Sequence, residues 1–153
     1  RKLTIDMLTL ISPDFLNNQD IPQKFTCQGE NVSPRLEISD VPESAETLLL
    51  IVDDPDAPQT TWLHWLVWNI DPTTTSLSSQ ALPVGAIEGI NDFMEFGYGG
   101  PCPPKYRHQY RFQLYALSKK IHLDKSASRA EIEMAIESHV LESCVLNGYY
   151  ERS

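Results

Sequence analysis

Cysteines are few in this sequence and stand far apart. The chain of 153 residues has three, Cys27, Cys102 and Cys144. Their spacing excludes a Cys-x-x-Cys redox pair and the four-ligand pattern of a zinc site. An odd number of cysteines without the spacing of a disulfide framework favours a reducing compartment. On this ground the sequence predicts a cytoplasmic protein.

Basic residues are also scarce. Lys and Arg number 12 against 21 Asp and Glu, which gives a net charge of −9. Phosphate backbones and anionic lipid surfaces are bound mainly by clusters of Lys and Arg, so we expect no nucleic-acid partner. A small anionic ligand is still compatible with this charge, because a few histidines and backbone N–H groups can outweigh it locally.

Several longer signatures are absent. No stretch approaches the ~18 consecutive apolar residues of a membrane span, so no integral membrane association is expected. Residues 1–10 lack the apolar core and cleavage site of a signal peptide. Without a repeat or linker, the sequence predicts a single domain over residues 1–153, either a monomer or a homodimer. The lack of a Gly-x-Ser-x-Gly elbow or Walker loop weakens the case for an enzyme.

Three segments have the patterns of strands. Residues 48–52 form an apolar run, typical of a strand buried on both faces. Residues 64–70 predict a second central strand, with one face formed by His64, Leu66, Trp68 and Ile70. Residues 110–116 alternate in polarity, and His108 joins the face of Tyr110 if this strand begins two residues earlier.

The last quarter of the chain predicts a helix. Ser128 and Glu131 have the spacing of a capping box. A buried stripe then recurs every four residues at Ile132, Ile136, Val140 and Cys144. Asn147-Gly148 has the composition of a left-handed helix stop, and residues 123–130 allow a further helical turn. The patterns together predict a mainly β, sandwich-like domain that is closed by a C-terminal helix.

Two rigid, turn-forming segments each lead to a histidine. Residues 53–58, Asp-Asp-Pro-Asp-Ala-Pro, precede His64, and residues 97–104, Gly-Tyr-Gly-Gly-Pro-Cys-Pro-Pro, precede His108. Chains that leave a sheet in this way often build binding loops. We expect the polar side chains of both segments to meet at the opening of one binding cavity. The candidate ligand-binding residues are Asp54, Pro58, Trp62, His64, Gly100, Pro101, His108 and Tyr110.

Such a mouth suits a phosphate group. Histidines gain positive charge beside an anion, and Tyr110 offers a hydroxyl donor. Gly99 and Gly100 allow backbone N–H groups to approach a ligand closely. Asp54 would repel a phosphate, so we expect it to orient His64 through a hydrogen bond or to receive an ammonium group. We expect no catalytic residue, metal or cofactor.

The same segments resemble the ligand pocket of the phosphatidylethanolamine-binding protein family, in the prokaryotic branch often called Raf-kinase-inhibitor-like proteins. Residues 27–34, Cys-Gln-Gly-Glu-Asn-Val-Ser-Pro, resemble the early motif of the family, and residues 89–93 resemble its mid-chain segment. Residues 138–152 resemble its closing helix, and the similarity covers nearly all of residues 8–152. The resemblance implies two antiparallel sheets in Greek-key order with helices near the C-terminus.

The resemblance also implies a function, a small-pocket binding module for phosphate, phosphoethanolamine-like anions or phosphorylated side chains. One role that the resemblance implies is regulation of a kinase or another signalling protein. A second implied role is protease inhibition, because relatives include protease inhibitors. The chain departs from the family at residues 105–107, where a glycine is common, and at Gln109, where an arginine is usual. Arg107 or Arg111 could supply the missing charge, although a regular strand turns Arg111 away from Tyr110.

Three other interpretations stay open at this point. Two histidines and a carboxylate also form the facial triad of non-haem iron enzymes. Cys102 could be a thiol nucleophile activated by His108, or simply a small buried hydrophobic residue. A hydrolase or transferase of phosphoryl or ester substrates would use His64 as general base, oriented by Asp54.

Overall fold

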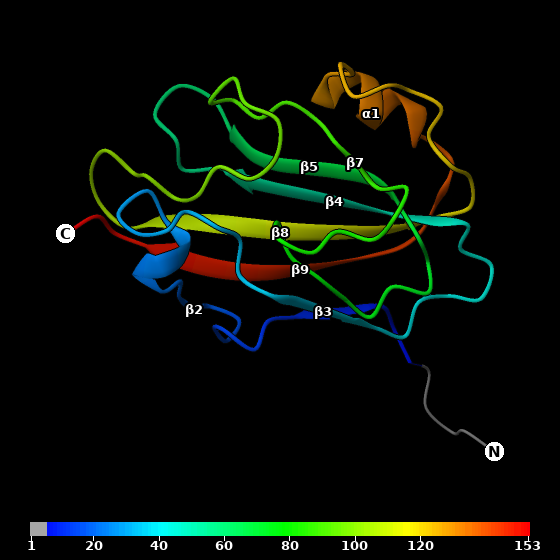
Figure 1. Ribbon diagram of the computed structural model, residues 1–153, viewed down its shortest axis with the longest axis horizontal. Coiled ribbons are helices and arrows are strands. Elements are labelled where there is room, and N and C mark those ends of the chain that lie inside the picture. Colours follow the sequence, from blue (N-terminus) through cyan, green and yellow to red (C-terminus); the bar gives the residue numbers. More distant parts are fainter. Residues whose placement is uncertain (1–5) are drawn as a thin grey trace.

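Two β-sheets and one short α-helix make up the computed structural model, which describes residues 6–153 (Figure 1). The larger sheet has six strands, in the order β2 (Gln19–Asp20), β9 (Val140–Tyr150), β8 (His108–Leu117), β4 (Thr47–Asp54), β5 (Trp62–Ile70) and β7 (Ile87–Glu88). The smaller sheet contains β1 (Thr9–Ile11), β3 (Leu36–Ser39) and β6 (Ser76–Leu77), and the helices are the 3₁₀ helix η1 (Gln23–Phe25) and α1 (Arg129–Ala135). The first five residues, half of the segment considered for a signal peptide, lie outside the described residues.

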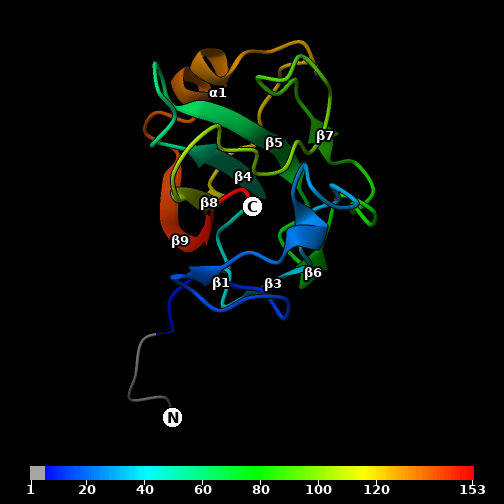
Figure 2. The same cartoon turned by 90° about the vertical axis from the view of Figure 1, so that its left-hand side faces the viewer.

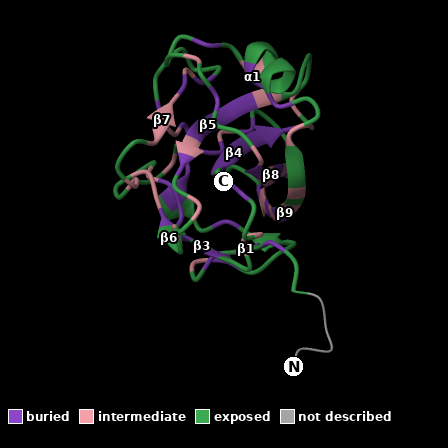
Figure 3. Cartoon of the chain, turned by 90° about the vertical axis from the view of Figure 1, so that its right-hand side faces the viewer, coloured by how far each residue is buried: buried purple, intermediate pink, exposed green. Residues whose placement is uncertain are grey.

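The layers follow from alternation along β4, whose eight residues are all buried. Leu48, Leu50 and Val52 face the core between the two sheets, whereas Leu49 and Ile51 face a second core beneath α1. Figure 2 shows α1 and the smaller sheet on opposite sides of the larger sheet. In Figure 3, β4 and β5 are largely buried while much of β9 is exposed. The predicted central strand and the mainly β, two-sheet fold are confirmed, with β2 and β9 as a parallel pair among the antiparallel ones.

The predicted strand at residues 64–70 is also confirmed, but two face assignments, those of His64 and Ile70, were wrong. His64 packs against Tyr110 of the core between the sheets, whereas Leu66 and Trp68 belong to the second core.

Ile70 packs in the core between the sheets with Trp65 and Val67, on the side opposite Trp68. The reason is a register shift in the pairing with β4, near Asn69, whose φ of 56° lies in the left-handed region. One extra residue in a strand turns every following side chain to the other face.

The predicted C-terminal helix is correct only at its start. The capping box is present, because Ser128 Oγ accepts a hydrogen bond from the Glu131 N–H at 3.1 Å and the Glu131 carboxylate accepts one from the Ser128 N–H at 2.9 Å. The helix ends at Ala135, and Ser138, with a φ of 68°, breaks the helical path. Residues 123–128 form no further α-helical turn.

Beyond Ser138 the chain is the strand β9, which pairs with β8 from Val140 to Tyr150. Gly148, predicted to stop a helix, lies within this strand opposite Tyr110. A Cβ atom at Gly148 would overlap the side chains of Ile21 and Phe15, so the glycine permits close packing rather than a left-handed turn. The prediction of a closing helix over residues 138–152 was therefore wrong.

Asp53 connects three elements on the helix side of the sheet. Its buried carboxylate accepts hydrogen bonds from Arg111 Nε at 2.8 Å and Arg111 Nη2 at 2.9 Å. Arg129 Nη1 lies 2.8 Å from Oδ2 of the same carboxylate. The carboxylate thus ties β4 to β8 and to α1. Arg111 faces away from Tyr110, as a regular strand predicts.

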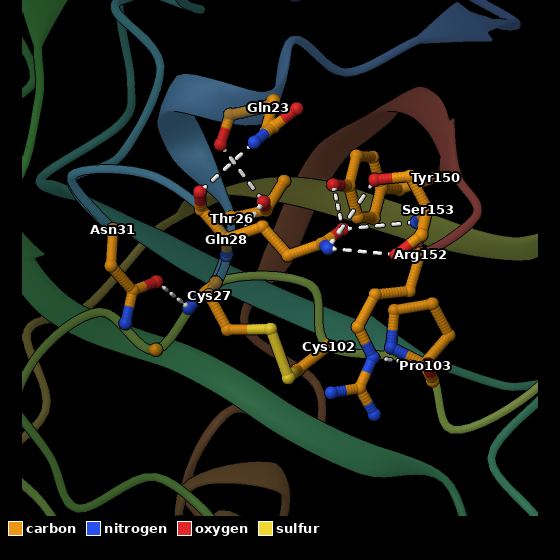
Figure 4. Close-up of a disulfide and its surroundings, with 12 residues drawn as sticks. Gln23, Thr26, Cys27, Gln28, Asn31, Cys102, Pro103, Tyr150, Arg152 and Ser153 are labelled. Atoms are coloured by element: carbon orange, nitrogen blue, oxygen red, sulfur yellow. Dashed lines mark hydrogen bonds between the residues drawn. A yellow bond between two sulfur atoms is a disulfide. The ribbon is translucent and has the colours of Figure 1, made fainter.

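Cys27 and Cys102 form a disulfide, with their Cα atoms 5.4 Å apart (Figure 4). Cys144 is the one free cysteine of the chain. The bridge joins the turn after η1 to the loop before β8. The C-terminal segment lies against both, since Arg152 Nε donates to the Pro103 carbonyl and the Ser153 N–H donates to Gln28 Oε1. Disulfides persist in oxidising compartments, so the cysteines give no support for the predicted cytoplasmic location. Within residues 6–153, no helix is both long and apolar enough to cross a membrane.

Removal of the disulfide is expected to destabilise the fold. The bridge closes a loop with a sequence separation of 75 residues, and bridges of this span restrict the unfolded chain enough to contribute about 2–4 kcal/mol. Urea denaturation of a variant with Cys27→Ser and Cys102→Ser should show that loss in the free energy of unfolding. Cys144→Ser is the control, with a change below about 1 kcal/mol expected. Equal stabilities of the two variants would contradict a structural role for the bridge.

Candidate functional site

A cavity of about 310 Å³ opens where β4 ends and where β5 and β8 begin. Six of the eight candidate residues from the sequence line it, namely Asp54, Pro58, Trp62, His64, His108 and Tyr110. Asp54, His64, His108 and Tyr110 are between 1% and 6% exposed. The two turn-forming segments therefore do bring their polar side chains to one mouth.

Gly100 and Pro101 do not line the cavity. The N–H of Gly99 donates to the His64 carbonyl at 2.9 Å, and the N–H of Gly100 donates to Asn31 Oδ1 at 2.8 Å. Both donors are used within the protein, so the prediction that they face a ligand was wrong. A Cβ on Gly100 would collide with the Phe25 carbonyl and with Asn31 Oδ1, which explains the glycine.

Asp54 is hydrogen-bonded to His108, not to His64 as the sequence suggested. Its Oδ2 atom lies 2.7 Å from His108 Nδ1, and both side chains are buried. Its Oδ1 atom accepts a hydrogen bond from the Asp56 N–H at 2.8 Å. His108 is within reach because it begins β8, the neighbour of β4 in the sheet. The carboxylate is therefore fixed through both of its oxygens.

His64 stands at an irregularity of β5. The pairing with β4 passes from Val52–Trp65 to Asp53–Leu63, which leaves His64 as the extra residue of a β-bulge. Bulges of this kind re-aim a side chain near functional sites. His64 Nδ1 lies 2.6 Å from the Gly99 carbonyl oxygen. Burial lowers the pKa of the imidazole, although the Gly99 carbonyl and the charge of Asp54 act in the opposite direction, so the ring is neutral at neutral pH.

Tyr110 contributes an unpaired hydroxyl. The side chain is 1% exposed, and within the described residues its oxygen has no hydrogen-bond partner of normal geometry. Burial raises its pKa, and so do the charge of Asp54 and an interaction with that carboxylate that falls short of normal hydrogen-bond geometry, so the hydroxyl keeps its proton. The ring packs edge-on against His64 at 5.2 Å and is stacked beside His108 at 6.5 Å. Buried hydroxyls almost always have a partner, so this one is available to a group that enters the cavity.

The walls of the cavity are apolar, and sequence reasoning missed part of them. Phe93 packs edge-on against Trp62 at 5.5 Å and against His64 at 5.3 Å. Its segment was noted only for its resemblance to the family, and no spacing rule pointed to it. The further lining residues are Ala57, Cys102, Pro103 and Pro104. Cys102 lies in the wall as half of a disulfide, so both sequence interpretations of it, free nucleophile and small hydrophobic residue, were wrong.

No Lys or Arg of residues 6–153 lines the cavity. Arg107 pairs with Asp20 at 2.8 Å and covers the ring of Tyr149, while Arg111 is bound to Asp53 on the other face of the sheet. The hypothesis that Arg107 or Arg111 replaces the positive charge missing at Gln109 was therefore wrong. The same described residues contain no group of three His, Cys, Asp or Glu side chains placed to hold a metal ion.

Comparison with known proteins places these features in a family. The family model described as phosphatidylethanolamine-binding protein matches residues 11–151. A UPF0098 protein of Pyrococcus horikoshii is 43% identical over 150 residues, which cover 93% of this chain and 76% of that protein.

Two solved structures have the same fold. A putative phosphatidylethanolamine-binding protein homologue from Chlamydia trachomatis superimposes with a TM-score of 0.90 at 35% identity, covering 96% of this chain and 99% of that one. YbcL of Escherichia coli is described as a new member of the mammalian phosphatidylethanolamine-binding protein family. It superimposes with a TM-score of 0.89 at 32% identity, covering 97% of this chain and 100% of that one. The chain belongs to the phosphatidylethanolamine-binding protein family.

Proposed function

We propose that the protein is a non-catalytic binding module whose cavity takes a phosphate group. The observation that carries this proposal is the buried Tyr110 hydroxyl, which lacks a partner in the described residues and lies beside two imidazoles. A phosphate oxygen is an acceptor that would satisfy it. The same group is presented by inorganic phosphate, by phosphoethanolamine and by a phosphorylated side chain.

The size of the cavity supports a small ligand. A volume of about 310 Å³ stands at the lower end of the usual range for ligand pockets, ~300–1,000 Å³. The apolar walls formed by Pro58, Trp62 and Phe93 can pack against the carbon atoms of an ethanolamine or peptide group. Regulation of a kinase or another signalling protein would follow if the phosphate belongs to a protein side chain. Nothing in the described pocket favours protease inhibition.

Hydrolysis of a phosphoryl or ester bond is the second candidate, and one observation favours it. A carboxylate that orients an imidazole, as Asp54 does for His108, is the arrangement of a general base. The base would then be His108 rather than His64, whose Nδ1 atom is bound to a carbonyl oxygen. Against catalysis, the cavity has no Ser or Thr among its described lining residues, and Cys102 is held in a disulfide.

NMR titration of ¹⁵N-labelled protein with phosphate and with phosphoethanolamine tests binding and turnover together. Saturable shifts are expected at Asp54, His64, Phe93 and Tyr110, because these residues line the cavity. The shifts should be lost in His64→Ala and in His108→Ala, and ³¹P spectra should show an unchanged ligand. Consumption of phosphoethanolamine that stops in His108→Ala would make the protein an enzyme. If neither phosphate nor phosphoethanolamine caused shifts at the cavity, the proposal would be refuted.

Tyr110→Phe is expected to separate binding from stability. Loss of the hydroxyl should weaken phosphate binding at least about tenfold, since hydrogen bonds to charged groups contribute ~1.5–3 kcal/mol. The ligand-free protein should become more stable by about 1 kcal/mol, because an unsatisfied buried donor is removed. Calorimetric titration and urea denaturation measure the two effects.

Tyr98→Phe is the matched control for this prediction. The Tyr98 hydroxyl donates to the Phe25 carbonyl at 2.7 Å, outside the cavity. Its loss should lower the free energy of unfolding by about 1 kcal/mol and leave phosphate affinity unchanged. Tyr110→Phe would contradict our assignment if it behaved like this control.

A further inference from the structure

Neighbouring protein atoms determine whether the ring nitrogens of His64 and His108 donate or accept hydrogen bonds in the cavity. The Gly99 carbonyl can only accept, so the proton of neutral His64 must be on Nδ1. This carbonyl is itself held in place, because the Gly99 N–H donates back to the His64 carbonyl and a Cβ on Gly99 would overlap the Phe93 ring. The Nε2 atom of His64, which has no hydrogen-bond partner among the described residues, is left as an acceptor.

His108 is constrained in the same way by a carboxylate. Its Nδ1 atom donates to Asp54 Oδ2 at 2.7 Å. Asp54 cannot turn freely, since its other oxygen accepts the Asp56 N–H. In the neutral imidazole the remaining nitrogen, Nε2, again carries a lone pair. With both imidazoles neutral, the side chains that line the inner end of the cavity present two nitrogen acceptors beside the single hydroxyl donor of Tyr110. No Lys or Arg side chain is among the described lining residues.

This pattern does not suit every anion. Sulfate carries no proton near neutral pH and offers only acceptors, so two of its oxygens would face nitrogen lone pairs. Hydrogen phosphate has the same shape and keeps at least one hydroxyl, which can donate to an imidazole nitrogen while another oxygen accepts from Tyr110. A site built to accept a ligand proton rejects an analogue without it, because its own polar atoms then stay unpaired.

We propose that this cavity selects oxyanions that carry a proton, and that Asp54 determines the selectivity by fixing the tautomer of His108. The inference rests on the proposed function, since it requires that the cavity binds the phosphate group. It adds the chemical class that the cavity accepts, namely hydrogen phosphate and the singly protonated form of phosphomonoesters such as phosphoethanolamine, which predominates below about pH 6. It also adds the class that the cavity rejects, fully ionised oxyanions such as sulfate.

The direct test compares sodium phosphate with sodium sulfate by isothermal titration calorimetry at equal ionic strength. Just above neutral pH both anions are chiefly dianions, so a difference reports the proton rather than the charge. Phosphate should bind at least about tenfold more tightly. Equal affinities would overturn the selectivity but leave the proposed function standing. Binding of neither anion would overturn the proposed function itself.

Asp54→Asn tests the assigned role of the carboxylate. Oδ1 of the new amide keeps the Asp56 N–H, so its NH₂ group occupies the position of Oδ2 and donates to His108 Nδ1. The proton of His108 must then move to Nε2 and face the ligand. Sulfate affinity should rise, and the ratio of phosphate to sulfate affinity should fall toward one. An unchanged ratio would overturn the role of Asp54.

Asp56→Asn is the matched control. It removes one negative charge two residues further along the chain, but Asp56 lies outside the cavity and accepts the Gln109 N–H at 2.9 Å. Both anions should bind somewhat more tightly, with their affinity ratio unchanged within about twofold. A fall in the ratio in this variant would assign the selectivity to charge and overturn the tautomer argument.

Discussion

The structure depends on one constraint, a strand that is buried on both faces and ends in two carboxylates. Alternation along β4 sends Asp53 toward the helix side and Asp54 toward the core between the sheets. A buried carboxylate is strongly unfavourable unless it is paired, so each needs its own partner. Two arginines satisfy Asp53, and an imidazole satisfies Asp54. The ion pairs of Asp53 tie β4 to β8 and to α1. The bond of Asp54 to His108 Nδ1 leaves the other ring nitrogen free for a ligand.

The remaining parts of the cavity follow from the pairing around β4. The register with β8 pairs Asp53 with Arg111, so Tyr110 follows directly at the end of β4, and His108, two residues away on β8, shares its face. On the other side, the bulge in β5 turns His64 toward Tyr110. The disulfide and the hydrogen bond from Gly100 to Asn31 hold the loop whose Gly99 carbonyl orients His64. The polar groups are therefore positioned before any ligand arrives.

Local patterns in the sequence predicted much of this arrangement. Apolar runs and alternation identified the central strands, and the capping box identified the start of α1. The stripe at Ile132, Ile136, Val140 and Cys144 was misleading, because residues four apart share a face in a strand as well as in a helix. A turn at residues 136–139, in which Ser138 has a positive φ that no local pattern required, separates α1 from β9.

Features that depend on register or on distant pairing could not be predicted in this way. Spacing along the chain favoured His64 as the partner of Asp54, whereas Asp54 bonds to His108, at the start of the neighbouring strand β8. The bridge between Cys27 and Cys102 joins segments far apart in the sequence, and an odd number of cysteines gave no sign of it. The role of Phe93 depends on a turn that folds back over β5, as the hydrogen bond from the Asp92 N–H to the Leu63 carbonyl shows.

The central claim is that protein acceptors fix the tautomers of both histidines, so that two lone pairs face the cavity. Long-range ¹H–¹⁵N correlation spectra of the ligand-free protein at neutral pH measure this directly, because the nitrogen shifts identify which ring atom carries the proton. We predict a protonated Nδ1 and an unprotonated Nε2 for His64 and for His108. A proton on Nε2 of either ring in the ligand-free protein would contradict it.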